Sequence, residues 1–324
     1  MKNRLKDSDF KLFQQIVVSN QKVLKRTMAK FLRKKYKTVV ETDKYVYAEG
    51  DIPIALVAHL DTVFDKAPTE IYYDREKNVI WSPQDLGADD RAGVFAIIKI
   101  IGTGLRPHII FTTDEETGGF GAQSISKLEC PFKDLRYIIQ LDRRGFMDCV
   151  FYECDNKDFT KYVEDFGFQE AYGSFSDISF ICPEWEIAGV NLSIGYKDEH
   201  TYSERLFVTP MLATIEKVKV MLQEEEIPFF KFMYDEYTQR FYARYGLSYA
   251  YDFDMIVCNG CKKEFFEEEV FLVKDEEGKT IYMCPDCIAT EVNWCPSCEE
   301  AFKTKDKEVV FCPDCRGKYF GNEK

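Results

Sequence analysis

Residues 54–61 read IALVAHLD, an apolar run that ends in alternating polar and apolar positions. A short apolar run of this kind, without Gly or Pro, is typical of a strand buried on both faces of a sheet. Because successive side chains on a strand point to opposite faces, His59 and Asp61 are expected on the same side. The run therefore predicts a central strand with two polar side chains at its C-terminal end.

Segments with the patterns of strands and helices alternate along the first 225 residues. Strands are predicted near residues 38–47, 107–113, 137–141, 149–152 and 189–194, with a hairpin over 71–81. Helices are predicted near residues 8–20, 21–36, 90–101, 121–128, 156–166 and 208–225. Such alternation favours a mainly parallel sheet that helices cover on both faces. The expected fold class is α/β, with a three-layer α/β/α core around a mixed, mainly parallel sheet.

The composition limits the classes of protein to which the chain can belong. It has 324 residues, a formal net charge of −13 and 15% aromatic residues. The aromatic content excludes disorder throughout, and no run approaches the roughly 18 apolar residues of a membrane span. The acidic balance disfavours nucleic-acid binding, which depends on Lys and Arg facing phosphates. Because residues 1–4 are followed by charged sequence instead of an apolar signal region, a cytoplasmic location is expected.

Polar motifs follow several of the predicted strands or stand in loops beside them. After His59 and Asp61 comes the loop GADDRAG over residues 87–93, and the pair Glu115-Glu116 follows the next strand. Asp142 ends a further strand, and His200 stands in a loop before the last helix. The C-terminal edge of a parallel sheet is where ligands bind in α/β folds. Two His residues and several carboxylates converging there suit a pair of Zn²⁺ ions or similar divalent cations.

The order of these motifs resembles that of the co-catalytic zinc exopeptidase superfamily, which includes the peptidase T-like, leucyl-type aminopeptidase and glutamyl aminopeptidase families. The resemblance covers about residues 1–225. It implies that one metal is held by His59, Asp89 and Asp142 and the other by Asp89, Glu116 and His200. It also implies that Glu115 is the general base and that the Asp89–Asp90 peptide bond is cis. The implied activity is that of a dinuclear metal-dependent exopeptidase, with Zn²⁺, or alternatively Co²⁺ or Mn²⁺, as the catalytic cation.

Further polar residues have supporting roles in this interpretation. Asp61 is expected to orient the imidazole of His59, because a carboxylate beside a ligating His fixes its tautomer. Arg143, directly after Asp142, is a candidate to bind a substrate carboxylate. Ser176, Asp177 and Glu204 are expected to support the site without taking part in catalysis.

The chain departs from the peptidase T-like pattern in one respect. Only 57 residues separate Asp142 from His200, too few for the lid or dimerisation domain that many of those relatives insert there. A compact catalytic domain over residues 1–225 is therefore expected. The C-terminal module or the helices of residues 1–37 are candidates to close the cleft. Those helices carry 12 basic and 2 acidic residues, which indicates either a docking face for an acidic partner or a solvated helix face.

Eight of the 12 Cys residues form four C-x-x-C pairs near the C-terminus. The pairs are Cys258/Cys261, Cys284/Cys287, Cys295/Cys298 and Cys312/Cys315. Two such pairs complete the tetrahedral thiolate shell of one structural Zn²⁺, so two zinc sites are expected. The gaps of 22, 7 and 13 residues favour sequential pairing as tandem zinc ribbons over residues 256–324 and leave an interleaved pairing open. The alternative, a disulfide-stapled extracellular module, is disfavoured by the missing signal region.

An aromatic-rich connector over residues 226–255 is expected to pack as a helix between the two parts. Residues 226–324 hold 13 basic and 20 acidic residues, so the zinc-ribbon module is expected to contact a protein partner and not nucleic acid.

The residues leave three functions open. The first is an aminopeptidase that acts on peptides. The second is an amidase or deacylase that acts on N-acyl amino acids, because the same dinuclear centre cleaves any accessible amide. The third is an inactive, hydrolase-like scaffold that binds partners through its zinc ribbons. The complete set of ligands and base favours catalysis.

Overall fold

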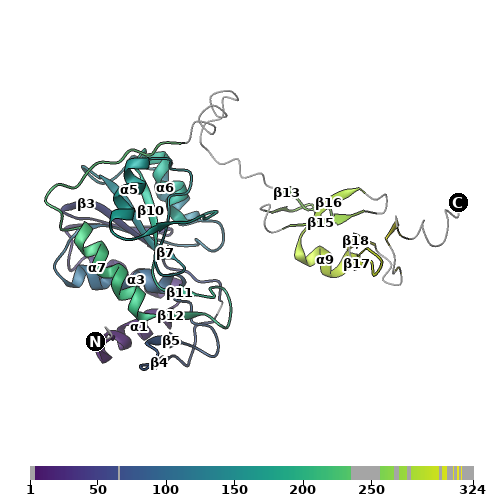
Figure 1. Cartoon of the computed structure of the whole chain (residues 1–324), viewed down its shortest axis with the longest axis horizontal. Helices are drawn as coiled ribbons and strands as arrows, with labels where there is room; N and C mark the ends of the chain where they lie inside the picture. The colour runs from purple at the N-terminus through teal and green to yellow at the C-terminus, as the bar shows by residue number, and fades with distance from the viewer. Residues whose placement is uncertain are drawn as a thin grey trace. The chain divides into compact units, whose positions relative to one another are not determined.

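The chain divides into two compact units, Met1–Gly246 and Leu247–Lys324, and each is described by itself. The computed structural model describes residues 4–64, 66–234, 256–265, 270–275, 279–298, 301–304, 309, 312–313 and 315. Figure 1 shows both units, with labels on many of their helices and strands. Among the described residues, no helix is both long and apolar enough to cross a membrane.

An eight-stranded mixed sheet forms the centre of the first unit. Its strand order is β1-β2-β6-β3-β7-β10-β8-β9. The four central strands β6, β3, β7 and β10 run parallel to one another. The β1–β2, β2–β6 and β10–β8 pairs are antiparallel, and β9 pairs parallel with β8 at the other edge. The bounds are β1 Thr38–Glu41, β2 Tyr45–Glu49, β3 Ile52–His59, β6 Pro107–Thr112, β7 Tyr137–Arg143, β8 Asp148–Val150, β9 Gln169–Glu170 and β10 Gly189–Ser193. The apolar run that begins at Ile54 is thus a central strand, as predicted.

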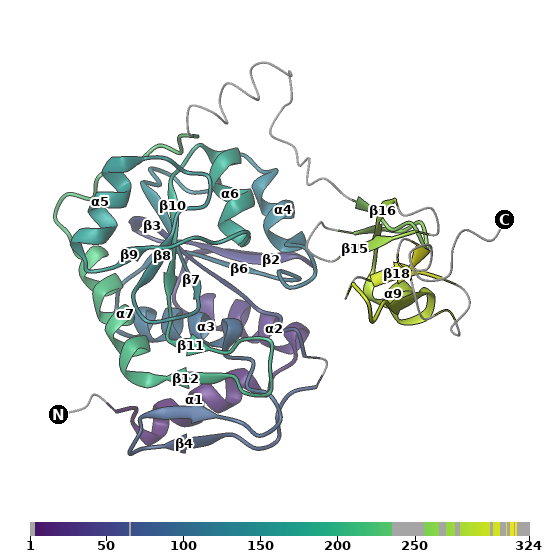
Figure 2. The same cartoon turned by 45° about the vertical axis from the view of Figure 1, so that its right-hand side comes forward.

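Helices cover both faces of this sheet, as Figure 2 shows. One face carries α2 (Gln21–Leu32), α3 (Ala88–Gly102) and α7 (Val208–Met221), and α1 (Asp7–Val17) packs on α3. The other face carries α4 (Phe120–Ser126), α5 (Lys157–Asp165) and α6 (Asp177–Trp185). The predicted three-layer α/β/α architecture is confirmed.

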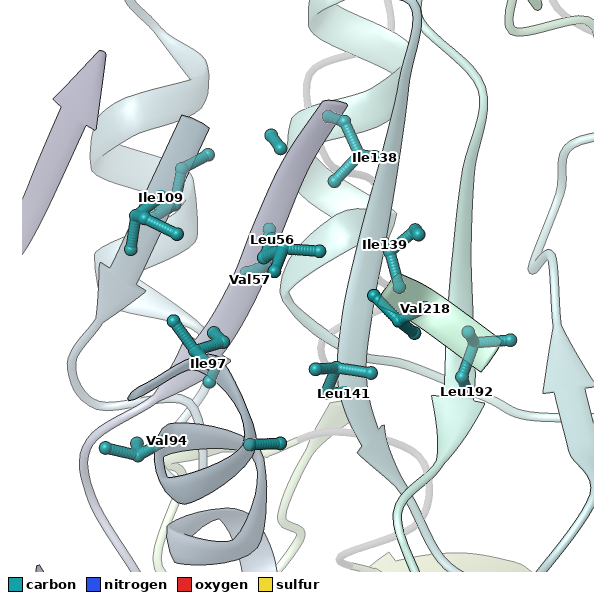
Figure 3. Packing of buried hydrophobic residues seen from close by; sticks show 14 of the residues in the cluster. Leu56, Val57, Val94, Ile97, Ile109, Ile138, Ile139, Leu141, Leu192 and Val218 are labelled. Atoms are coloured by element: carbon teal, nitrogen blue, oxygen red, sulfur yellow. The ribbon is translucent and has the colours of Figure 1, made fainter. Parts of the chain in front are cut away.

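The core lies between the sheet and the helices, and Figure 3 shows part of it. Leu56 of β3 lies opposite Ile139 of β7 in the ladder, and both are fully buried. Ile97 of α3 and Val218 of α7 are fully buried in the same cluster. Each such side chain contributes about 1.5–3 kcal/mol when it leaves water. This packing makes the strand ends a rigid base for the loops that follow them.

Gly93 allows α3 to approach the sheet closely. A Cβ atom at this position would lie 2.3 Å from the main-chain oxygen of Leu141 and 2.4 Å from Oδ1 of Asp90. No larger residue fits without moving the backbone. The close contact holds the first turn of α3, which includes Asp89, beside the C-terminal end of β7.

The first unit also contains a small antiparallel sheet. Two of its strands follow β3 in the chain, and the other two follow β10. Its strand order is β11-β12-β5-β4, with β4 Tyr72–Asp74, β5 Val79–Trp81, β11 Tyr196–Lys197 and β12 Arg205–Phe207. The loop between β11 and β12 carries His200. The pairing of β12 with β5 therefore anchors the loop that presents this imidazole.

Residues 227–234 pack against other segments of the first unit in an extended conformation. Phe230 and Phe232 are buried, and the main-chain N–H of Phe230 donates to the carbonyl of Arg136. Isolated bridges join Ile187 to Lys231 and Cys154 to Tyr234. The expectation of a helix here is wrong for these residues, because their main-chain groups bond to neighbouring segments and not to one another. The rest of the predicted connector, residues 235–255, lies outside the described residues.

The second unit is a small module of short strands and one helix. It contains the hairpin β13-β14 (Ile256–Val257 and Glu264–Phe265) and a four-stranded sheet of order β16-β15-β18-β17. The sheet strands are β15 Phe271–Lys274, β16 Thr280–Met283, β17 Val292–Trp294 and β18 Ala301–Lys303, and α9 spans Pro285–Glu291. Two small clusters of buried residues, each rich in Cys, form its core. This architecture fits a zinc-ribbon module.

Candidate metal centre

The polar motifs singled out in the sequence meet at the C-terminal ends of β3, β6 and β7. His59 is the last residue of β3, and Asp142 is the last but one of β7. Glu115 and Glu116 follow the end of β6, and Asp89 stands in the first turn of α3. The loop after β11 brings His200 to the same place. The structure therefore gathers residues that are up to 141 positions apart in the sequence.

Asp89 lies between the two imidazoles. Its Oδ1 is 3.1 Å from Nε2 of His59, and its Oδ2 is 3.3 Å from Nε2 of His200. Nε2 of His59 also lies 3.4 Å from Oδ1 of Asp142. Nε2 of His200 lies 3.1 Å from Oε2 of Glu116. Two donor sets thus share the carboxylate of Asp89, and such a shared carboxylate can bridge two cations.

Potential ligand atoms from these residues lie within 4.8 Å of one another in two groups. One group is His59, Asp89 and Glu116, and the other is His59, Asp90 and Asp142. The carboxylate of Asp90 is already engaged, since Oδ2 accepts from the N–H of His59 and Oδ1 from the N–H of Gly93. The carboxylate of Asp89, in contrast, faces the two imidazoles. Imidazole and carboxylate donors of this kind could hold Zn²⁺ or a similar divalent cation.

Asp61 and Glu115 lie beside these donors. Oδ1 of Asp61 is 3.4 Å from Nδ1 of His59, the ring nitrogen that faces away from Asp89. The other oxygen of Asp61 accepts from the N–H of Glu116 at 3.0 Å. Oε2 of Glu115 lies 3.9 Å from Nε2 of His59, and its side chain has no closer ion-pair partner among the described residues. Asp61 is thus placed to orient an imidazole, and Glu115 lies next to the donors without joining them.

The pKa values in this cluster reflect a surplus of buried carboxylates over bases. Burial, followed by repulsion from Asp142, Asp177 and Glu116, raises the pKa of Glu115 well above its usual value even though His59 opposes it. Burial and the charge of Asp89 raise the pKa of Asp142 to about 7. Hydrogen bonds to Asp89 and Glu116 raise the pKa of His200 to about 11. Bound cations would offset the same surplus of negative charge.

Glu204 holds the loop that presents Asp89. Its two carboxylate oxygens accept from the main-chain N–H groups of Ala88 and Asp89, at 3.1 and 3.0 Å. The Asp89–Asp90 peptide bond is cis, which confirms the expectation from the resemblance. Glu204 is 1% exposed, so its role is internal and supporting.

Asp142 is held by polar residues from three elements. Gln140 and Ser176 donate to Oδ2, and the hydroxyl of Tyr196 donates to the main-chain oxygen and to Oδ1. Sequence reasoning singled out Ser176 but missed Gln140 and Tyr196. Gln140 could have been found from strand alternation, since residues 140 and 142 share one side of β7. Nothing local marks Tyr196, which reaches Asp142 only through the turn after β10.

Asp177 is fully buried close to the same centre. It accepts a hydrogen bond from the hydroxyl of Thr112 at 2.5 Å, and burial raises its pKa to about 7. It helps to raise the pKa of Glu115. Asp177 therefore supports the site electrostatically.

The remaining candidate, Arg143, and the third His residue of the chain, His108, form no hydrogen bond or ion pair with the metal-site residues in the described part of the chain. Arg143 donates to the main-chain oxygen of Tyr172 at 3.0 Å, and its Nε is 4.0 Å from Asp148, so its recorded contacts are not with the metal-site residues. His108 stands at the start of β6, at the opposite end of the sheet. It accepts from the N–H of Gly50 and stacks on Phe132, which indicates a structural role.

In the second unit, the Cys pairs cluster sequentially. Cys258, Cys261, Cys284 and Cys287 form one group, and Cys295, Cys298, Cys312 and Cys315 form the other. Each group could hold one metal ion. Although burial opposes it, hydrogen bonds from main-chain N–H groups lower the pKa of Cys258 to about 6. A lowered pKa favours the thiolate that binds metal.

The fold is similar to that of several aminopeptidases of known structure. A tripeptidase from Staphylococcus aureus aligns with a TM-score of 0.55 at 13% identity, over 68% of this chain and 100% of that chain. A TET aminopeptidase from a marine sediment archaeon of the Thaumarchaeota aligns with a TM-score of 0.54 at 11% identity, over 68% and 98%. The chain has a peptidase-like fold. An aminopeptidase from the archaeon Desulfurococcus kamchatkensis also aligns, with a TM-score of 0.52 at 13% identity, over 68% and 96%. No protein-family model and no curated protein sequence matches the chain.

Proposed function

We propose that this chain is a metal-dependent aminopeptidase with a dinuclear centre. The observation that carries the proposal is the carboxylate of Asp89, with one oxygen facing His59 and the other facing His200. Asp142 would complete the ligands of the first cation and Glu116 those of the second. The similarity of the fold to aminopeptidases supports the same class of reaction.

The residues of the chain have distinct roles in the proposed reaction. Bound divalent cations would lower the pKa of a water molecule toward about 7 and polarise the scissile carbonyl. Glu115 would accept a proton from the attacking water and return it to the leaving amine, a role that suits a buried carboxylate with a raised pKa. Asp61 holds the ring of His59 in the orientation that its ligand role requires.

The second unit is proposed to hold two structural Zn²⁺ ions, one in each group of four Cys. Two such ions would stabilise a module too small to depend on its hydrophobic core alone. A protein partner for this module stays a prediction from its acidic composition.

The proposed function is tested by metal content and hydrolysis together. Purified wild type and Asp89→Ala are compared by elemental analysis and with panels of aminoacyl anilides and N-acyl amino acids. We expect about four zinc equivalents in the wild type and about two in the variant, with loss of aminoacyl-anilide hydrolysis. Asp51→Ala, an exposed carboxylate just before β3, is the matched control and should behave as the wild type.

Other outcomes point to the alternatives. Cleavage of N-acyl amino acids without cleavage of anilides would replace the aminopeptidase with a deacylase. If both proteins hold only about two zinc equivalents and cleave neither panel, the dinuclear centre is wrong and the scaffold interpretation takes its place.

A further inference from the structure

The loop of residues 198–204 joins β11 to β12 and carries His200, whose imidazole has different surroundings from that of His59. The side chain of His59 is 1% exposed and has Asp61 beside its Nδ1, whereas the side chain of His200 is 49% exposed. Among the described residues, the only carboxylates within ion-pair distance of His200 belong to the proposed metal site, and both face its Nε2. No carboxylate of this part of the chain therefore orients the ring of His200 from its other nitrogen.

The main chain of this loop has a conformation that is uncommon for residues other than glycine. Asp198 and His200 have φ angles of +58° and +61°, in the left-handed region. Residues with a Cβ atom keep such a conformation where surrounding contacts impose it. Inside the loop, the hydroxyl of Thr201 donates to the main-chain oxygen of Asp198 at 2.6 Å. The direction of the His200 side chain therefore depends on the contacts that hold this main chain.

Glu199, between the two left-handed residues, joins the loop to the end of β7. Its Oε1 lies 2.7 Å from Nη1 of Arg144, the residue that follows β7. The main chain at Arg144 is itself held in place. Its oxygen accepts from the hydroxyl of Ser193 at 2.7 Å, and the N–H of Gly145 donates to the main-chain oxygen of Tyr196 at 2.9 Å. Arg144 is therefore a fixed point to which the side chain of Glu199 is tied.

Other side-chain contacts of the loop are few. The ring of Tyr202 stacks on Phe64 with centroids 6.3 Å apart, and Glu204 accepts from main-chain N–H groups at the far end of the loop. Within the described residues, the pair Arg144–Glu199 is the only ion pair of residues 198–204 apart from those of His200. The side chain of Glu199 is 18% exposed, so the pair is partly removed from the water that weakens exposed ion pairs.

We propose that the Arg144–Glu199 ion pair is a positioning contact for His200 and thereby sets the affinity of the second cation site. Neither residue of the pair would touch the cation or the substrate. The first site draws its proposed ligands from β3, α3 and β7 and none from this loop, so its affinity should not depend on the pair. The inference rests on the proposed dinuclear centre, since it assigns the contact that controls one of its two sites.

The test is a calorimetric titration with Zn²⁺ on the full-length protein, stripped of metal at the centre but with about two zinc equivalents still held by its Cys groups. His200→Ala identifies the binding step that belongs to the second site. Arg144→Ala should raise the Kd of that step by about two- to fivefold, as expected for a partly exposed ion pair, and leave the other step unchanged. Arg33→Ala removes an ion pair of similar length and exposure, with Glu41, and is the matched control that should change neither step.

Exchange of the two charges separates a direct contact from a general effect on the loop. Arg144→Glu should raise the Kd of the second step more than Arg144→Ala does, because two carboxylates would then face each other. Adding Glu199→Arg to this variant should restore most of the affinity, since the pair forms again with opposite polarity. A double variant that binds no better than Arg144→Glu overturns the inference, as does an equal loss in both steps of Arg144→Ala.

The outcomes also separate this inference from the proposed function. Two zinc-binding steps in the wild type, neither of them changed in Arg144→Ala, overturn the inference and leave the dinuclear centre standing. If both steps respond as expected and no anilide is cleaved, the positioning contact stands and the peptidase is wrong. Absence of zinc binding beyond the Cys groups overturns the two together.

Discussion

At the scale of single residues, the candidate centre depends on carboxylates that differ in what they contact. Asp89 faces both imidazoles, whereas Asp90 accepts from two main-chain N–H groups. Glu204 accepts from the main-chain N–H groups of the loop that carries Asp89. Glu115 and Glu116 are neighbours in sequence, yet only Glu116 lies close to His200. Adjacent acidic residues thus have separable roles, which substitutions can distinguish.

The first prediction concerns Glu115 and Glu116. Glu115→Gln removes the proposed base but no proposed ligand, so turnover should fall by about 10²–10⁴-fold or more while the metal content stays that of the wild type. Glu116→Gln removes a ligand and should lower metal affinity. Elemental analysis and anilide hydrolysis measure both effects. Loss of metal from Glu115→Gln, with metal retained in Glu116→Gln, would exchange the two assignments.

The second prediction concerns His108 and acid stability. Burial lowers the pKa of His108 from 6.5 to about 4, so the unfolded chain takes up a proton at a higher pH than the folded protein does. The contribution of His108 to stability is therefore present above about pH 6.5 and is lost as the pH falls toward 4. Between pH 7 and pH 4.5 the loss should be about 2–3 kcal/mol.

His108→Asn tests this by urea denaturation at both pH values. The free energy of unfolding of the variant should fall with pH by about 2–3 kcal/mol less than that of the wild type. Since His108 lies at the end of the sheet opposite the candidate centre, effects of acid on that centre cancel in the comparison. Equal pH dependence in the two proteins would show that His108 does not titrate in this way.

At the scale of elements, the first unit is held together by contacts between segments distant in sequence. Gly93 lets α3 lie against β7, and the turn between α1 and α2 is tied to the centre through Ser19 and Arg91. The segment of residues 227–234 is joined by main-chain contacts to Arg136 before β7, to residues 154–155 before α5 and to residues 186–188 before β10. The side chain of Asn156 joins the start of α5 to the segment of residues 227–234.

The third prediction concerns Asn156. Its side-chain oxygen caps α5 by accepting from the N–H of Phe159, and its amide donates to the main-chain oxygen of Lys231. Asn156→Ala should lower the free energy of unfolding of the first unit by about 1–3 kcal/mol, since both bonds are lost. Asn156→Asp keeps the cap and should cost less. Urea denaturation measures the difference, and equal losses in both variants would mean that the cap contributes nothing.

At the scale of the whole molecule, two units carry three candidate metal sites of different chemistry. The centre in the first unit uses imidazoles and carboxylates, whereas each site in the second uses four Cys. Hard oxygen donors with open positions suit catalysis, and closed thiolate shells suit structural zinc. Substitution of the His and carboxylate donors should therefore leave metal bound at the Cys sites, and substitution of the Cys residues should leave metal bound at the centre of the first unit.

The fourth prediction tests the pairing of the Cys residues. In an Asp89→Ala background, Cys258→Ser with Cys284→Ser should leave about one zinc per chain, because both changes fall in one group. Cys258→Ser with Cys295→Ser should leave almost none. Interleaved pairing predicts the reverse result for the two double variants. Elemental analysis of both proteins therefore decides between the two pairings.

The sequence by itself determined the α/β/α class, because an apolar run such as 54–58 and the helical patterns around it are local signals of burial. It also indicated the candidate donors, from His59 to His200, because metal chemistry demands particular residue types and these occur in a recognisable order. The Cys spacing indicated thiolate sites in the same way.

Only the tertiary structure decided how distant residues meet. It showed that Glu204 holds the main chain at Asp89 and that Tyr196 contacts Asp142. It also grouped the Cys pairs sequentially and replaced a predicted helix at residues 227–234 with an extended segment. The physical reason is that these features depend on contacts between segments far apart in the chain, which no local pattern of residues encodes.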